Sequence, residues 1–131
     1  MPNPARELAR EWLIRAENDL RVARFLLTMQ DPPPESIGFH AQQCAEKALK
    51  AYLTFQQISF ERRHDLSYLI DLCIPHEPDF AQFRILADML TPYAVEFRYP
   101  EALTPLAIEP VREGVAAAQL IYAFVVGLLE S

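Results

Sequence analysis

Apart from Pro2 and Pro4, the prolines of this chain fall in three stretches, "DPPPES" at residues 31–36, "IPHEP" at 74–78, and residues 91–110. Proline lacks a backbone N–H and its ring clashes with the preceding turn, so these stretches cannot continue a helix. Between them, apolar residues recur at steps of three and four, which is the spacing of one helical face. No alternating pattern typical of strands and no internal repeat appears. The sequence therefore predicts helices bounded by proline-rich connections.

Five helical segments follow from this pattern. The first covers residues 5–29, and the second runs from residue 35 or 36 to residue 56 or 57. Asp65 is expected to cap a short third helix, because its carboxylate can accept a hydrogen bond from an unpaired backbone amide. Residues 79–90 form a fourth helix, and the last runs from residue 110 or 111 to 129, with proline suited to its first turn. One more helical turn is expected near residues 94–97.

The buried faces of the first, second and fourth segments can be read from the same periodicity. In chain order they are Ala9, Trp12, Ala16, Leu20, Ala23 and Leu27; Ile37, Ala41, Cys44, Ala45, Ala48, Tyr52 and Phe55; and Phe80, Phe83, Leu86, Ala87 and Leu90. Because the connections are short, the predicted fold is all-α, an antiparallel up-and-down four-helix bundle with an additional short helix. At 131 residues we expect one domain spanning the chain.

Composition excludes several classes of function. A formal net charge of -6 argues against a general nucleic-acid binder but leaves room for a local cationic site. Two cysteines without C-x-x-C spacing and the lack of a secretory signal favour a reduced, cytoplasmic protein. The apolar tract at residues 115–129 is shorter than the roughly 20 residues that span a bilayer, so we expect a buried helix and no membrane association. Three glycines cannot build a phosphate loop, and the three histidines lack metal-ligand spacing, so no cofactor or metal is expected.

Both lysines of the chain lie in "FHAQQCAEKALKAYL", residues 39–53. His40, Gln43, Lys47 and Lys50 fall within an arc of about 80° on the second helix and form a polar ridge. One interpretation is a solvated face, in which Glu46 neutralises Lys50 at a spacing of four. The other interpretation is a surface that contacts an anion.

Two further stretches support the anion-binding interpretation. "RRHDL" places Arg62, Arg63 and His64 at the entrance to a helix, where backbone amides already favour anions. "FRYP" places Arg98 and Tyr99 in a connection, and polar residues on loops are often functional. Each also has a structural explanation: Arg98 as an ion-pair partner, Tyr99 as a loop anchor, and His64 as a satisfied edge histidine.

The order of these motifs resembles the HEPN (higher eukaryotes and prokaryotes nucleotide-binding) domain over nearly the whole chain. A first helix with tryptophan is followed by "FHAQQCAEKALKAYL", then "HDLSYLIDLC", then "FRYP" before a final helix. The resemblance implies an antiparallel four-helix bundle with an additional short helix that commonly forms dimers. It also implies that small prokaryotic members are encoded beside a minimal nucleotidyltransferase, as toxin–antitoxin-like pairs, and that a large branch consists of metal-independent ribonucleases.

The chain departs from the ribonuclease pattern of that family, in which an Arg is followed four to six residues later by a His. No Arg lies at that distance before His40, His64 or His76, and the substitute catalytic pair would be Arg63, or Arg62, with His64. We therefore expect a nucleotide- or RNA-phosphate-binding subunit that forms homodimers and acts with a minimal nucleotidyltransferase partner. The alternatives are a divergent metal-independent ribonuclease and a purely protein-binding dimeric module. The expected ligand-binding residues are His40, Gln43, Lys47, Lys50, Arg62, Arg63, His64, Arg98 and Tyr99, with Tyr99 or Tyr93 available to stack on a base.

Overall fold

The structure is a computed structural model that describes residues 3–95 and 106–130. Within these ranges it contains α-helices and short 3₁₀ helices and no strand, which confirms the predicted all-α class. The elements, in chain order, are α1 (Pro4–Leu27), α2 (Pro34–Phe55), α3 (Leu66–Cys73), η1 (Pro78–Phe83), α4 (Arg84–Leu90), η2 (Thr91–Ala94) and α5 (Ile108–Glu130).

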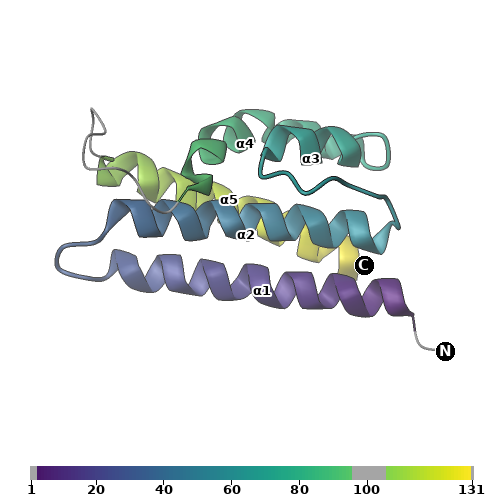
Figure 1. Ribbon diagram of the computed structural model, residues 1–131, viewed down its shortest axis with the longest axis horizontal. Helices are drawn as coiled ribbons and strands as arrows, with labels where there is room; N and C mark the ends of the chain where they lie inside the picture. Colours follow the sequence, from purple (N-terminus) through teal and green to yellow (C-terminus); the bar gives the residue numbers. More distant parts are fainter. Residues whose placement is uncertain (1–2, 96–105, 131) are drawn as a thin grey trace.

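The helices form the predicted bundle. α1 and α2 pair as a long antiparallel hairpin, α5 runs alongside both in the direction of α2, and the shorter η1–α4 unit returns in the direction of α1 (Figure 1). α3 is the additional short helix and lies beside α4 over α2 (Figure 1). Alanines are frequent among the buried residues of α1 and α2: Ala16 and Ala23 on α1 and Ala41, Ala45 and Ala48 on α2 belong to one core cluster. Small side chains allow two helices to approach closely.

Most of the predicted buried faces are buried, and the differences lie at their margins. Trp12, Leu27, Phe55 and Leu86 are only partly covered. The fourth helix is also not uniform, because it begins as the 3₁₀ helix η1 and becomes α-helical at Arg84. A 3₁₀ segment is tighter than an α-helix and commonly forms the entry to one.

Two helix ends set the position of the loop that carries Arg62, Arg63 and His64. Just after α2, Gln57 lies in the left-handed region at φ 59, and the N–H groups of Gln57 and Ile58 donate to the carbonyls of Thr54 and Leu53, respectively. This pair of hydrogen bonds is the Schellman pattern, which turns the chain sharply. At the other end of the loop, Asp65 caps α3 by accepting from Ser67 N–H at 3.0 Å, as predicted. The loop is therefore fixed at both ends.

α5 is longer than the apolar tract seen in the sequence. It begins at Ile108, with Pro110 in its first turn, and extends to Glu130. By length and mean hydropathy of 1.4 it is able to cross a membrane, although the core helices of soluble proteins have the same properties. In this fold its residues Val111, Val115, Ile121 and Val125 are buried in the bundle core.

Candidate functional site

One cluster of polar side chains joins α1 to α2 around Asp19. The Nδ1 of His40 lies 2.8 Å from Oδ1 of Asp19, and Lys47 Nζ donates to Oδ2 at 2.6 Å. Asp19 is only 8% exposed, while the side chains of His40 and Lys47 are about a quarter exposed. A buried carboxylate needs such partners, because leaving it unpaired costs several kcal/mol. We call Asp19, His40 and Lys47 the Asp19 cluster. Its hydrogen bonds and ion pairs link α1 to α2.

A second cluster joins α2 to the loop before α3 around Glu46. Gln42 Nε2 donates to Oε1 of Glu46 at 3.0 Å and to the backbone carbonyl of His64 at 3.1 Å. Lys50 Nζ donates to Oε2 at 2.8 Å, and Nδ1 of His64 lies 2.9 Å from Oε1. Every polar side chain of this Glu46 cluster therefore has a defined partner, and the cluster ties the loop to the helix.

The surroundings of Glu46 favour the charged form of its carboxyl group. Burial by itself would raise the pKa of Glu46, but hydrogen bonds from Lys50, Gln42 and His64, together with the charge of Lys50, outweigh it and lower the pKa below its ordinary value of 4.5. Lys50 is 7% exposed, and its Nζ lies 5.7 Å from the ring centroids of both Trp12 and Phe60. A cation over an aromatic face is stabilised by the ring quadrupole.

His64 is the exposed member of the Glu46 cluster. Its side chain is 68% exposed, although Nδ1 is held by Glu46. A carboxylate at Nδ1 keeps the proton there in the neutral ring, so the lone pair is left on Nε2. Beside it, the guanidinium of Arg63 lies 3.3 Å from Asp65 and over the ring of Tyr68, and the exposed Arg62 forms no ion pair with any described residue. The loop thus presents an oriented imidazole and two guanidinium groups to solvent.

A sequence model of the HEPN domain family matches residues 9–129. The chain belongs to the HEPN domain family. Among solved structures, TT1696 from Thermus thermophilus is similar with a TM-score of 0.73 and 29% identity, over 91% of this chain and 96% of that one. ST0689, an archaeal HEPN homologue, has a TM-score of 0.71 and 30% identity, over 92% and 97% of the two chains. The resemblance carried by the motifs is confirmed.

A curated relative matches part of this HEPN chain. The protein of Methanocaldococcus jannaschii named "Putative toxin MJ1304" is 48% identical over 59 residues, which make up 45% of this chain. The match spans only 37% of that relative's own length.

The HEPN fold brings some of the predicted site residues together and separates others. Gln43 donates to Oε1 of Gln42 at 2.8 Å and so joins Lys50 and His64 in the network of the Glu46 cluster. His40 and Lys47 belong to the Asp19 cluster instead. The expectation of a solvated ridge is wrong at Lys50, which is buried, although its predicted pairing with Glu46 is confirmed. Arg98 and Tyr99 lie outside the described residues.

Three residues that organise these clusters were not among the predicted site residues: Asp19, Gln42 and Glu46. Asp19 lies between Ala16 and Ala23 at helical spacing, so a carboxylate on an apolar face was the available signal. Gln42, Glu46 and Lys50 follow each other at steps of four, which places all three on one side of α2.

The two cysteines take no part in either cluster. Burial raises the pKa of Cys44 to about 12, with a smaller contribution from the charge of Asp19, and burial raises that of Cys73 to about 12. A thiol reacts as its thiolate, so neither side chain is a nucleophile at neutral pH. Across residues 3–95 and 106–130, no three His, Cys, Asp or Glu side chains are grouped in a way that could hold a metal ion.

Proposed function

We propose that this HEPN protein is the nucleotide- or RNA-phosphate-binding subunit of a toxin–antitoxin-like pair, acting in the cytoplasm with a minimal nucleotidyltransferase partner. The observation that carries the proposal is the exposed His64, whose Nδ1 is held by the buried Glu46 next to Arg62 and Arg63. Guanidinium groups contact phosphate oxygens bidentately, and the lone pair on Nε2 of His64 can accept a hydrogen bond from a hydroxyl group of the ligand.

The remaining predicted residues support this surface in different ways. Lys47 and Lys50 each pair with a carboxylate, and Arg63 lies near Glu61 and Asp65, so among the described residues of this surface Arg62 supplies the positive charge that no carboxylate balances. We assign Lys50 and Gln43 to positioning Glu46, and through it His64. The partly exposed His40 and Lys47 extend the polar surface along α2. Arg98 and Tyr99 stay assigned to ligand contact on the resemblance alone.

The partner assignment rests on family membership and on the partial match to a protein named as a putative toxin. We further propose that the chain forms homodimers, as the family resemblance implies. The exposed apolar side chains of α1, Leu8, Ile14, Val22 and Phe25, provide a surface that a second protein chain could cover. Coexpression with a minimal nucleotidyltransferase, followed by sedimentation, tests both assignments.

Phosphate binding is tested by fluorescence anisotropy with a labelled single-stranded RNA, in the presence of EDTA and with ATP as competitor. We expect the double variant Arg62→Ala/Arg63→Ala to bind RNA at least about tenfold more weakly, because a charge-assisted hydrogen bond contributes roughly 1.5–3 kcal/mol. Binding should also weaken as salt rises, since phosphate contacts release counterions.

The matched control is Arg84→Ala/Arg112→Ala, which removes the same charge from two exposed arginines paired with Asp71 and Glu109. It should bind RNA as the parent protein does. Equal weakening in both double variants would show that only net charge matters and would refute the site.

The divergent ribonuclease is a second candidate because two histidines, His40 and His64, each hold Nδ1 against a buried carboxylate. Such histidines serve as acid and base in RNA cleavage. We expect no turnover of end-labelled RNA without metal. Cleavage that is lost in His64→Ala would replace the binding proposal with the enzymatic one.

A further inference from the structure

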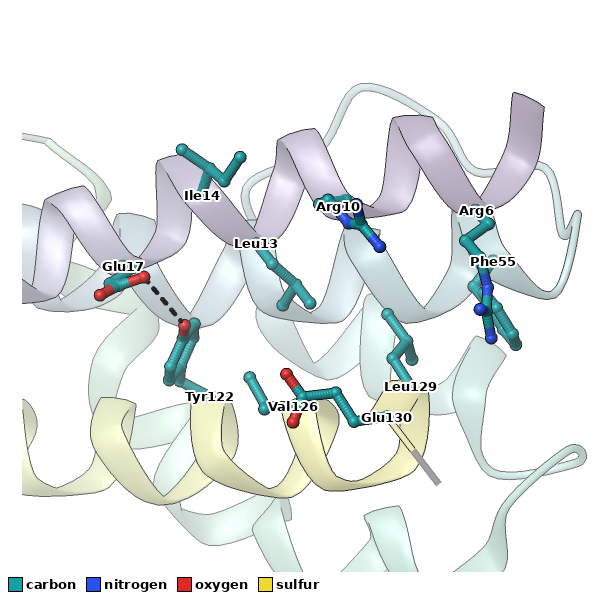
Figure 2. Close-up of a pocket in the computed structure, with 10 residues that line it drawn as sticks. All are labelled: Arg6, Arg10, Leu13, Ile14, Glu17, Phe55, Tyr122, Val126, Leu129 and Glu130. Carbon is teal, nitrogen blue, oxygen red and sulfur yellow. Dashed lines mark hydrogen bonds between the residues drawn. The ribbon is translucent and has the colours of Figure 1, made fainter. Parts of the chain in front are cut away.

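A pocket of about 480 Å³ lies between α1 and α5 (Figure 2), and no member of the Asp19 cluster or the Glu46 cluster lines it. Its apolar wall comes from both helices: Leu13 and Ile14 on α1, and Val126 and Leu129 on α5. Ligand pockets of small molecules typically measure about 300–1,000 Å³ and are lined mainly by apolar side chains. The size and lining therefore fit a small molecule with an apolar body.

One end of this pocket is cationic. Arg6 and Arg10 line it one helical turn apart, and neither forms an ion pair with a carboxylate in the described part of the chain. The guanidinium of Arg6 lies over the ring of Phe55, 5.7 Å from the ring centroid. Like charges at this spacing destabilise a helix, and an anion between them relieves that repulsion.

The other charged side chains of the pocket determine which way round a ligand would bind. Glu17 lies at the far end and accepts from the hydroxyl of Tyr122 at 3.5 Å (Figure 2). The side chain of Glu130, on the last turn of α5, points toward Val126 and away from Arg6 (Figure 2). Arg6 and Arg10 therefore form the cationic end of a pocket whose four charged side chains together carry no net formal charge.

We propose that this pocket binds a small amphiphilic anion of the medium-chain carboxylate class. Its carboxylate lies between Arg6 and Arg10, and its apolar chain lies along Leu13, Val126 and Leu129 toward Glu17. The negative charge of Glu17 repels the ligand's carboxylate from the other end of the pocket. The inference is independent of the proposed phosphate site, since the two share no residue.

The test uses 1-anilinonaphthalene-8-sulfonate, an apolar fluorescent anion, with decanoate and decanol as competitors. We expect one saturable site per chain, displaced by decanoate at a concentration at least fivefold lower than by decanol. Arg6→Gln/Arg10→Gln should weaken decanoate binding at least fivefold while RNA binding stays unchanged. The control Arg21→Gln/Arg24→Gln removes two arginines that line a separate groove on α1 and should leave decanoate binding within twofold.

A second variant tests the apolar wall. Val126→Trp should fill the space and abolish decanoate displacement, and circular dichroism will show that helical content and melting temperature are retained. The proposal is overturned if decanol competes as well as decanoate, if the control weakens binding as much as the Arg6/Arg10 variant, or if Val126→Trp folds and still binds. Loss of RNA binding without any change in decanoate binding would count against the phosphate site alone.

Discussion

A single carboxylate, that of Glu46, holds polar side chains from α2 and from the loop before α3. It accepts hydrogen bonds from Gln42 and Lys50 and engages Nδ1 of His64, while it is itself only 4% exposed. A buried ion pair contributes little net stability compared with apolar residues, but removing one partner leaves an uncompensated buried charge. The main effect of this cluster is therefore to fix the orientation of His64.

Glu46→Gln should lower the free energy of unfolding by about 3 kcal/mol, because the charge of the buried Lys50 loses its partner. Urea denaturation measures the change. The double variant Glu46→Gln/Lys50→Met removes both charges and should lose less than the single variant. A larger loss in the double variant would show that packing, not charge, dominates at this position.

The lowered pKa of Glu46 also predicts a pH dependence. Because the pKa is lower in the folded chain than its ordinary value of 4.5, the unfolded chain binds the proton more readily. The stabilisation by Glu46 is therefore present above pH 4.5 and is lost as pH falls through the folded pKa. Denaturation between pH 6 and about 3 should show a steeper loss of stability in the parent protein than in Glu46→Gln.

At the scale of elements, the contact between α2 and η2 depends on the absence of a side chain. A Cβ added at Gly38 would lie 2.9 Å from Cγ of Tyr93, and Cβ atoms in proteins essentially never approach another side chain to within 3.0 Å. Gly114, at the start of α5, approaches Leu90 and the same tyrosine ring. Glycine is unfavourable inside a helix, so its presence at both positions is explained by close packing of three elements around Tyr93.

Two glycine substitutions with opposite outcomes follow from this geometry. Gly38→Ala should destabilise the protein by about 1–3 kcal/mol, because Tyr93 must move. Gly127→Ala should stabilise it by about 0.5–1 kcal/mol, because a Cβ there meets nothing within 4 Å and alanine favours the helix. Thermal and urea denaturation measure both changes. Stabilisation of both variants would show that the contact at Gly38 relaxes without cost.

At the scale of the whole molecule, an aromatic cluster holds the short elements against the long helices. The ring of Phe80 in η1 lies 4.8 Å from that of Tyr52 in α2 and 5.0 Å from that of Phe124 in α5, measured between centroids. Phe83 also packs against Phe124 at 5.1 Å. Phe80 is fully buried, so this cluster joins three elements that are distant in sequence.

Phe80→Ala should therefore cost about 3–5 kcal/mol of stability, since it removes a buried ring and leaves a cavity. Ile85→Ala is the control, because Ile85 is 82% exposed and lies outside the proposed dimer surface, so its truncation should change stability by less than about 0.5 kcal/mol. Urea denaturation followed by circular dichroism measures both. A small loss for Phe80→Ala would mean that the short elements do not unfold together with the bundle.

The positions of the helices could be predicted from the sequence, because proline and apolar periodicity act locally. The stretch at residues 31–36 separates α1 from α2, and Asp65 caps α3, as the local residue types require. The family resemblance could also be read from the order of the motifs. These features depend on neighbours within a few residues of each other along the chain.

The tertiary structure decided which polar residues are buried and which face solvent. Periodicity places Lys50 on a ridge, but the loop that carries His64 and the ring of Trp12 on α1 cover that part of α2. The pocket that contains Arg6 and Leu129 likewise forms between the first and last helices. The physical reason is that an isolated helix determines only the direction of each side chain, whereas burial and electrostatic environment depend on neighbours that are far apart in sequence.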